Sequence, residues 1–210
     1  MIARMASEAR RMPQPMRPSG FAGRIFGFFM ERLAAPNYRW VIAVLAPAKP
    51  DTYLEIGFGT GRLAELVAQK LKPSRIAGVD PSKLMFERAA KRLKRHRNRI
   101  EIDLKFGDDT ALDWPPRSFD AIVASHSYQF WSDPLATFAR VRALLTPHGR
   151  FVLVIRSHIS DDVSKWIPNP ITKAGNELQG LREALARSGF RIERDEKLRT
   201  GSQGVVAVCA

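Results

Sequence analysis

The sequence predicts a doubly wound α/β domain, a seven-stranded and mostly parallel sheet that closes with a C-terminal antiparallel hairpin. From residue 52 onward, short β-branched runs alternate with stretches of helical periodicity. Alternation of this kind implies parallel strands joined by right-handed helical crossovers. Near the C-terminus, two short strand-like runs are joined around Gly201 with no helix between them. This last pair predicts the hairpin.

The elements follow in order from the same patterns. Strands are expected at 52–58, 75–80, 100–108, 119–127 and 150–157, each an apolar or alternating run. Helices are expected at 61–71, 81–95, 133–149 and 176–190; Pro147 and Gly149 stop the third, and Gly189 stops the last. The hairpin pairs 191–198 with 205–210.

Three segments lie outside this alternation. Residues 1–20 are basic and rich in proline, and we expect a flexible N-terminal arm. Residues 21–48 are expected to form a pair of helices, an N-terminal extension of the single domain 21–210. Residues 157–173 carry two prolines and no clear period. They follow the fifth strand, so we expect an insert on the substrate side of the sheet.

Composition narrows the function classes. The formal charge of +13 favours anionic partners, although the basic run 87–99 is best explained as a solvated helix face. No apolar run approaches the roughly 18 residues of a membrane span. Arg24 interrupts the apolar stretch a secretory signal would need, and the single Cys209 cannot form an internal disulfide. We therefore expect a cytoplasmic protein.

The loop after the first strand indicates a ligand site. Gly57, Gly59 and Gly61 follow an apolar run and open a helix, where glycine allows sharp turns and close ligand approach. A dinucleotide loop would place its third glycine at position 62, which is Arg62. Glu55 would repel a phosphate but attract an ammonium group, although it could simply end the strand. The pattern therefore disfavours an NAD-dependent oxidoreductase.

Two further carboxylates stand at predicted strand ends. Asp80 ends the second strand and could accept hydrogen bonds from both hydroxyls of a ribose, or cap the helix that starts at Pro81. Asp108 ends the third strand and could accept from an adenine amino group, or only form a turn. Together they favour a nucleoside without selecting which one.

These motifs stand in the order found in a known family. The runs YLEIGFGTGRLA, GVDPSKLM, KFGDDTALDWPPRSFDAIVASHSYQFWSDP and ARVRALLTPHGRFVLV resemble class I (Rossmann-like) S-adenosylmethionine-dependent methyltransferases, and especially the type 11 small-molecule group. The resemblance covers roughly residues 37–156. It implies the class I fold, S-adenosyl-L-methionine as cofactor and methyl transfer as activity.

The resemblance also assigns the cofactor site, residue by residue. The glycine loop and Glu55 would hold the methionine moiety, and Asp80 would hold the ribose. Met85 and Asp108 would border adenine, with Asp109 adjacent through its backbone, and Ser125 would lie beside the methyl donor. The full cofactor set is Glu55, Gly57, Phe58, Gly59, Gly61, Asp80, Pro81, Met85, Asp108, Asp109 and Ser125. No metal-binding residue is expected.

The acceptor side is less defined. His126 and Tyr128 follow the fourth strand and are the catalytic candidates. His126 could be a general base or a packed histidine. Tyr128 could line an aromatic wall with Phe130 and Trp131 or belong to the core. His158 and Trp166 in the insert are weaker candidates.

The expected acceptor is a small hydrophobic or aromatic molecule. The apolar residues of 21–33 recur near helical spacing, which fits a helix over the active site or peripheral contact with an anionic membrane. The latter would suit a phospholipid N-methyltransferase. Nucleic acid is disfavoured, because SHSYQF stands where DNA and protein amino-methyltransferases carry an NPPY-like tetrapeptide. A non-catalytic cofactor sensor or RNA-binding protein is the alternative from another class. The oligomeric state stays open.

Overall fold

The computed structural model describes residues 20–156 and 175–210, with the side chains of 31–155 and 178–210. The expected arm over 1–19 and the insert over 157–173, with His158 and Trp166, lie outside the described residues. The helices are α2 (Gly20–Leu45), α3 (Arg62–Lys70), α4 (Lys83–Leu93), α5 (Pro134–Leu144) and α6 (Gly175–Arg187), with the short 3-10 turns η1 (Ala46–Ala48), η2 (Lys94–His96) and η3 (Tyr128–Phe130).

Seven strands form one sheet, as predicted. They are β1 (Thr52–Ile56), β2 (Arg75–Asp80), β3 (Glu101–Phe106), β4 (Phe119–Ser125), β5 (Leu145–Arg156), β6 (Phe190–Lys197) and β7 (Ser202–Cys209), in the order β3-β2-β1-β4-β5-β7-β6. Strands β1 to β5 pair in parallel, and β7 pairs antiparallel with both β5 and β6. The predicted doubly wound sheet with its terminal hairpin is confirmed.

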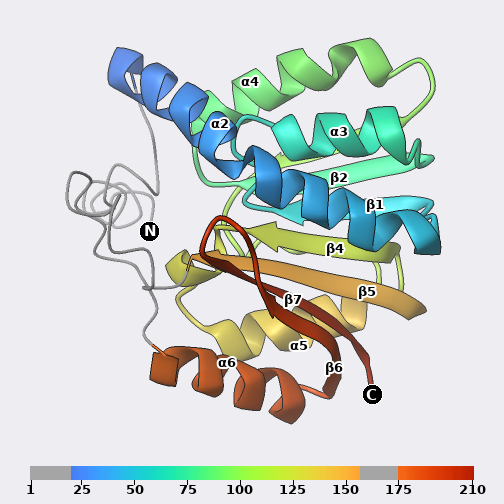
Figure 1. Cartoon of the computed structure of the whole chain (residues 1–210). Coiled ribbons are helices and arrows are strands. Elements are labelled where there is room, and N and C mark those ends of the chain that lie inside the picture. The colour runs from blue at the N-terminus through green and yellow to red at the C-terminus, as the bar shows by residue number, and fades with distance from the viewer. Residues whose placement is uncertain (1–19, 157–174) are drawn as a thin grey trace, which may run out of the picture.

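The strand order reverses between β1 and β4. Figure 1 shows α2, α3 and α4 on one face of the sheet and α5 and α6 on the other. Because ligands bind at the carboxyl ends of parallel strands where the order reverses, the ends of β1 and β4 define the place to look for a site.

The core lies in two layers, one on each side of the sheet. Alternate residues of β4 divide between them: Ile122 packs toward α5 and α6, and Val123 packs toward α2 and α3. All of these side chains are buried. The sheet is therefore covered on both faces, which explains its nearly continuous apolar strands.

Two of the differences from the predicted boundaries have a clear physical cause. The expected helix pair over 21–48 is one helix, α2, followed by the turn η1, and Pro36 lies inside α2. Pro36 is exposed, so solvent can reach the carbonyl that loses its hydrogen bond, while the next turns are held by packing of Val41 and Leu45. The third predicted helix ends at Leu144, because Leu145 already pairs with Phe119 as the start of β5.

Candidate functional site

The loop after β1 is packed against the loop after β4. The Gly57 amide donates to the Val79 carbonyl at 2.8 Å, and Ser127 Oγ donates to the Ile56 carbonyl at 2.6 Å. Gly57 has φ +78°, and a Cβ built there would stand 2.5 Å from Ser127 Cβ. Position 57 therefore admits only glycine, for steric as well as conformational reasons.

The rest of the glycine loop leaves space beside the sheet. A Cβ at Gly59 would meet no atom within 4 Å, whereas one at Gly61 would lie 2.8 Å from Ala89 Cβ. Gly61 caps α3 and its amide donates to the Phe58 carbonyl at 2.9 Å. Phe58 itself is buried and lies against Gly78. The open side of the loop is thus at Gly59.

Asp80 ties this loop to the end of β2. Its Oδ2 accepts from the Gly59 amide at 2.7 Å and its Oδ1 accepts from the Ser82 amide at 2.9 Å. The side chain is 5% exposed, and burial raises the pKa of the carboxyl to about 6 despite these two hydrogen bonds. Each oxygen keeps a second lone pair, so two further donors can be accommodated.

Glu55 is a second buried carboxylate at the same edge. It is 3% exposed, and Tyr53 Oη donates to its Oε2 at 3.1 Å. Burial raises the pKa of Glu55 to about 8; hydrogen bonds from Tyr53 and the Ala64 amide oppose this, and the charge of Asp80 adds to it. From α2, Tyr38 also lies near: burial, followed by the charge of Glu55, raises the pKa of its phenol.

The predicted adenine residues follow β2 and β3. Met85 is buried on the first turn of α4, and Pro81 is half-buried before the Ser82 cap. Asp108 Oδ1 accepts from the Thr110 amide at 2.9 Å and its hydroxyl at 2.6 Å, so the carboxylate closes a turn. Asp109 is buried, and its Oδ2 accepts from Thr137 Oγ1 at 2.6 Å.

The loop after β4 holds the other predicted residues. Ser125 Oγ is buried and has no hydrogen-bond partner within the part of the chain that the structure describes. His126 has φ +57°, and its Nε2 lies 3.0 Å from Asn37 Nδ2. Tyr128 is 8% exposed and packs between Trp131 and Phe138, at ring-centroid distances of 5.5 and 5.9 Å.

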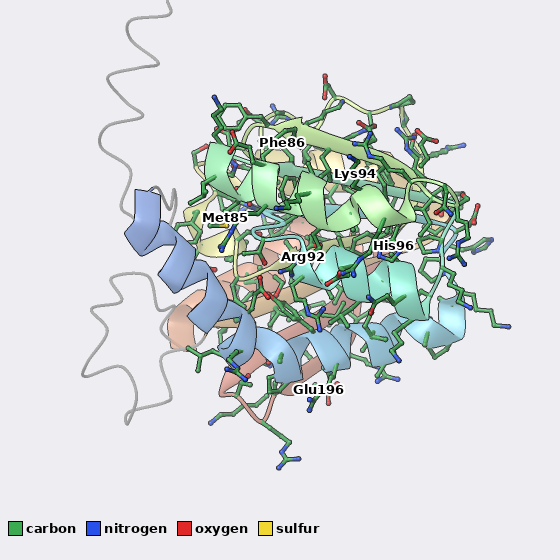
Figure 2. The ribbon with its side chains drawn as sticks, turned by 90° about the horizontal axis from the view of Figure 1, so that it is seen from above. Met85, Phe86, Arg92, Lys94, His96 and Glu196 are labelled. Carbon is green, nitrogen blue, oxygen red and sulfur yellow. The ribbon has the colours of Figure 1, made fainter. Side chains whose placement is uncertain are left out.

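Figure 2 shows how the helical face beside the site is held together. Met85 and Phe86 lie at the N-terminal end of α4, and Lys94 and His96 follow its other end. Arg92 of α4 lies 2.9 Å from Glu31 of α2 and 3.9 Å from Glu65 of α3. The buried Glu65 also pairs with Arg62 at 2.6 Å and with Arg95 of η2. Glu65 therefore links α3 to α4 and η2, and Arg92 extends the network to α2.

The two carboxylates Glu55 and Asp80 have no ion-pair partner among residues 31–155 and 178–210. Taking a charge out of water without a counter-charge disfavours the charged form, which is why both pKa values are raised. A ligand with a positive charge would therefore gain from this site, and one with phosphates would be repelled by it. Hydroxyl groups suit the remaining lone pairs of Asp80.

Known proteins share the fold described above. A family model described as a methyltransferase domain matches residues 54–151, from β1 into β5. A SAM-dependent methyltransferase from Aquifex aeolicus superposes with a TM-score of 0.64 at 17% identity, over 76% of this chain and 82% of its own. The chain therefore has the class I methyltransferase fold, and residues 54–151 match a methyltransferase-domain family model. S-adenosylmethionine is the cofactor that this family and fold imply.

Other relatives agree on the class. A TehB-like SAM-dependent methyltransferase from Corynebacterium glutamicum superposes with a TM-score of 0.64 at 15% identity, over 89% of this chain and 97% of its own. A demethylmenaquinone methyltransferase from Thermotoga maritima is 32% identical over 114 residues, 54% of this chain and 47% of the relative. The match thus spans about half the length of that relative. The predicted resemblance to class I methyltransferases is confirmed.

The methyltransferase domain has features that fit this cofactor. S-adenosylmethionine carries an ammonium, a sulfonium and two ribose hydroxyls. The site offers two buried carboxylates that have no ion-pair partner among the described residues, beside a glycine with open space. Ser125 Oγ adds a buried polar atom without a partner among the described residues. The residues present therefore fit the cofactor.

Sequence reasoning did not find four residues that shape the site. Tyr38 and Asn37 come from α2, and Ser127 and Gln129 come from the loop after β4. Ser127 lies between the two predicted catalytic candidates, His126 and Tyr128, so its position in the sequence could have indicated it. The two α2 residues carry none, because their partners lie far away in the sequence.

Among the described residues, no helix has both the length and the apolar character needed to cross a membrane.

Proposed function

We propose that the methyltransferase domain transfers a methyl group from S-adenosylmethionine to a small hydrophobic or aromatic acceptor. The observation that carries this proposal is the pair of buried carboxylates, Glu55 and Asp80, at the adjacent ends of β1 and β2. Between them the loop opens at Gly59, whose amide is already fixed by Asp80. A charged carboxylate at position 55 would repel the phosphates of a dinucleotide.

The proposed roles follow the carboxyl edge of the sheet. Glu55 faces the ammonium group and Asp80 accepts from the ribose hydroxyls. Met85 and the turn at Asp108 border the adenine, and Ser125 lies beside the methyl donor. Gly57, Phe58, Gly59, Gly61, Pro81 and Asp109 complete the proposed site by shaping its backbone.

The chemistry asks little of the protein beyond alignment. When bound, the cofactor supplies an activated methyl group on a sulfonium. This chain's residues orient the methyl donor and acceptor in line and exclude water. The loop after β4 contributes to both tasks. Ser127 Oγ donates to the Ile56 carbonyl of β1 at 2.6 Å, and the buried rings of Tyr128 and Trp131 pack against each other within the loop.

Aromatic surroundings support an apolar acceptor. Tyr128 and Trp131 form one edge of a cluster that continues through Phe138 to Phe151. In this proposal Tyr128 shapes the acceptor side by packing. Three relatives named demethylmenaquinone methyltransferase act, by their name, on a molecule of this apolar class.

Thermal shift tests the cofactor assignment. A ligand present at 100 times its dissociation constant stabilises by about 2.7 kcal/mol. For a chain of this size that corresponds to roughly 5–11 °C in melting temperature. We expect this rise with S-adenosylhomocysteine and S-adenosylmethionine and none with NAD. A rise with NAD alone would overturn the proposal, and binding without turnover on any quinol, phenol or amine panel would indicate a sensor.

We also infer that the face formed by α2 and α4 contacts anionic surfaces. Exposed cations lie on α2, at the C-terminal end of α4 and in the residues that follow it: Arg32, Arg39, Lys91, Lys94, Arg95, Arg97 and Arg99. Sedimentation with phosphatidylglycerol vesicles tests it, and vesicles of phosphatidylcholine alone are the reference. Lys91→Glu with Lys94→Glu should abolish binding. The matched double reversal Arg140→Glu with Arg187→Glu, on α5 and α6 across the sheet, makes the same change in net charge and should leave binding intact. Equal losses would show that only net charge matters.

A further inference from the structure

The turn after β4 is held in an unusual conformation by several contacts. His126 has φ +57°, a region that non-glycine residues enter at a cost of about 1–2 kcal/mol. Its amide donates to the Val154 carbonyl at 2.8 Å, and its carbonyl accepts from Gln129 Nε2 at 2.9 Å. The backbone of His126 is thus fixed on both its amide and its carbonyl side.

A buried side chain of α2 meets this ring. Asn37 is 2% exposed, and its Nδ2 lies 3.0 Å from His126 Nε2 and 3.2 Å from Ser202 Oγ. Its Oδ1 lies 2.6 Å from Thr200 Oγ1. Asn37 therefore connects α2 to the loop after β4 and to the turn between β6 and β7.

The distances decide which way the Asn37 amide faces. Hydrogen bonds between two oxygens are typically about 2.7–2.8 Å long, and those from nitrogen to oxygen about 2.9–3.0 Å. The 2.6 Å contact with Thr200 suits Oδ1, and the 3.2 Å contact with Ser202 suits Nδ2. The amide nitrogen therefore also faces His126. Because an amide nitrogen only donates, His126 Nε2 must accept.

We propose that Asn37 is a positioning residue that holds His126 in the neutral Nδ1–H tautomer, with Nε2 occupied as a hydrogen-bond acceptor. In this state the ring has no lone pair available to take a proton. His126 Nδ1–H is then a hydrogen-bond donor, and Asn37, itself held by Thr200 and Ser202, keeps the ring in this state.

This inference narrows the acceptor and, in that respect, rests on the proposed function. A base at His126 would be needed for an acceptor that must lose a proton during transfer. With the Asn37 contact intact, His126 does not supply one. The acceptor class is therefore a nucleophile that already carries a reactive lone pair, such as a neutral amine, a thiolate or an acidic enolate or phenolate.

Nitrogen NMR tests the tautomer directly. At about pH 8, well above the ordinary histidine pKa of about 6.5, two-bond ¹H–¹⁵N spectra distinguish a protonated from an unprotonated ring nitrogen. The chain has four histidines, so the variant His126→Gln assigns the signal. We expect protonated Nδ1 and unprotonated Nε2 in the unmodified protein. A proton on Nε2 in the unmodified protein would by itself overturn the proposal.

Two variants isolate the role of Asn37. Asn37→Asp keeps the size but offers only acceptors, so Nε2 should become protonated; an unprotonated Nε2 in this variant would also refute the proposal. Ser202→Ala removes the other Nδ2 contact and should leave the tautomer unchanged. The exposed His148 is an internal reference in every spectrum. Calorimetry with S-adenosylhomocysteine is run in parallel: absence of binding would remove the proposed function, while the tautomer result stands independently.

Discussion

Asp80→Asn separates ligand binding from stability. The Asp80 carboxylate accepts two backbone amides, from Gly59 and Ser82, and has two lone pairs left for ribose hydroxyls. Asparagine has nearly the same shape but only one acceptor oxygen. Hydrogen bonds to a charged group contribute about 1.5–3 kcal/mol each. Losing one of the two ribose contacts should therefore weaken S-adenosylhomocysteine binding by about 2–3 kcal/mol, roughly 30- to 150-fold.

Stability of the ligand-free protein should respond differently. Folding raises the pKa of Asp80 from 3.8 to about 6. The unfolded carboxyl gives up its proton first, so raising the pH from below 4 to above 6 favours the unfolded state. At about 1.36 kcal/mol per pKa unit, the cost reaches roughly 3 kcal/mol above pH 6. Asparagine removes that cost but loses one amide hydrogen bond, worth about 1–3 kcal/mol.

The expected result is a variant that binds poorly and melts no lower than the unmodified protein. Calorimetry with S-adenosylhomocysteine and thermal melting at about pH 8 measure both quantities. Asp120→Asn is the matched control, because Asp120 accepts the Asp51 and Thr52 amides at the opposite edge of the sheet. It should lower stability and leave affinity unchanged. If Asp80→Asn behaves like Asp120→Asn, Asp80 is a structural cap and the ribose assignment is wrong.

Three further outcomes are expected. Since the pKa of Glu55 is about 8, affinity for S-adenosylhomocysteine should rise about tenfold per pH unit from 6.5 to 7.5 in calorimetry, and Glu55→Gln should flatten that rise. Gly57→Ala should unfold at lower denaturant than Gly59→Ala, because only the Cβ at 57 meets Ser127 Cβ, at 2.5 Å; equal losses would mean backbone strain alone. Glu65→Gln should lower the free energy of unfolding by about 2 kcal/mol, or roughly 4–8 °C in melting temperature, without changing cofactor affinity. This is less than the roughly 3–5 kcal/mol typical of a broken buried ion pair, because the arginine partners of Glu65 are partly exposed.

Much of the fold follows from local pattern. Alternation along β4 places Ile122 and Val123 on opposite faces, and a strand buried on both faces must be apolar throughout. The glycine loop could also be predicted from the sequence. Gly57 and Gly61 have φ of +78° and +73°, and because few other residues adopt such values, glycines at these positions indicate the turn. Asp80 was found because it ends a predicted parallel strand, and ligands bind at the carboxyl ends of such strands.

Contacts between distant segments decided the rest. Pro36 favours a helix break by local rules, yet α2 continues through it, because residues buried against the sheet hold the next turns. The sequence around Tyr128 fitted either an aromatic wall of the acceptor site or the hydrophobic core. Its ring stacks on Phe138, and this contact depends on where α5 packs against the sheet.

The chain by itself therefore determined the succession of strands and helices and the position of the ligand loop, because those depend on periodicity and on backbone conformations that favour glycine. The class of cofactor came from the resemblance of its motifs to a known family. Only the tertiary structure decided the contact of His126 with Asn37, since the two residues are 89 positions apart and the other partners of Asn37 are 163 and 165 residues from it. No local pattern encodes a hydrogen bond of that separation: it arises when a packed helix and a hairpin turn close on the same edge of the sheet.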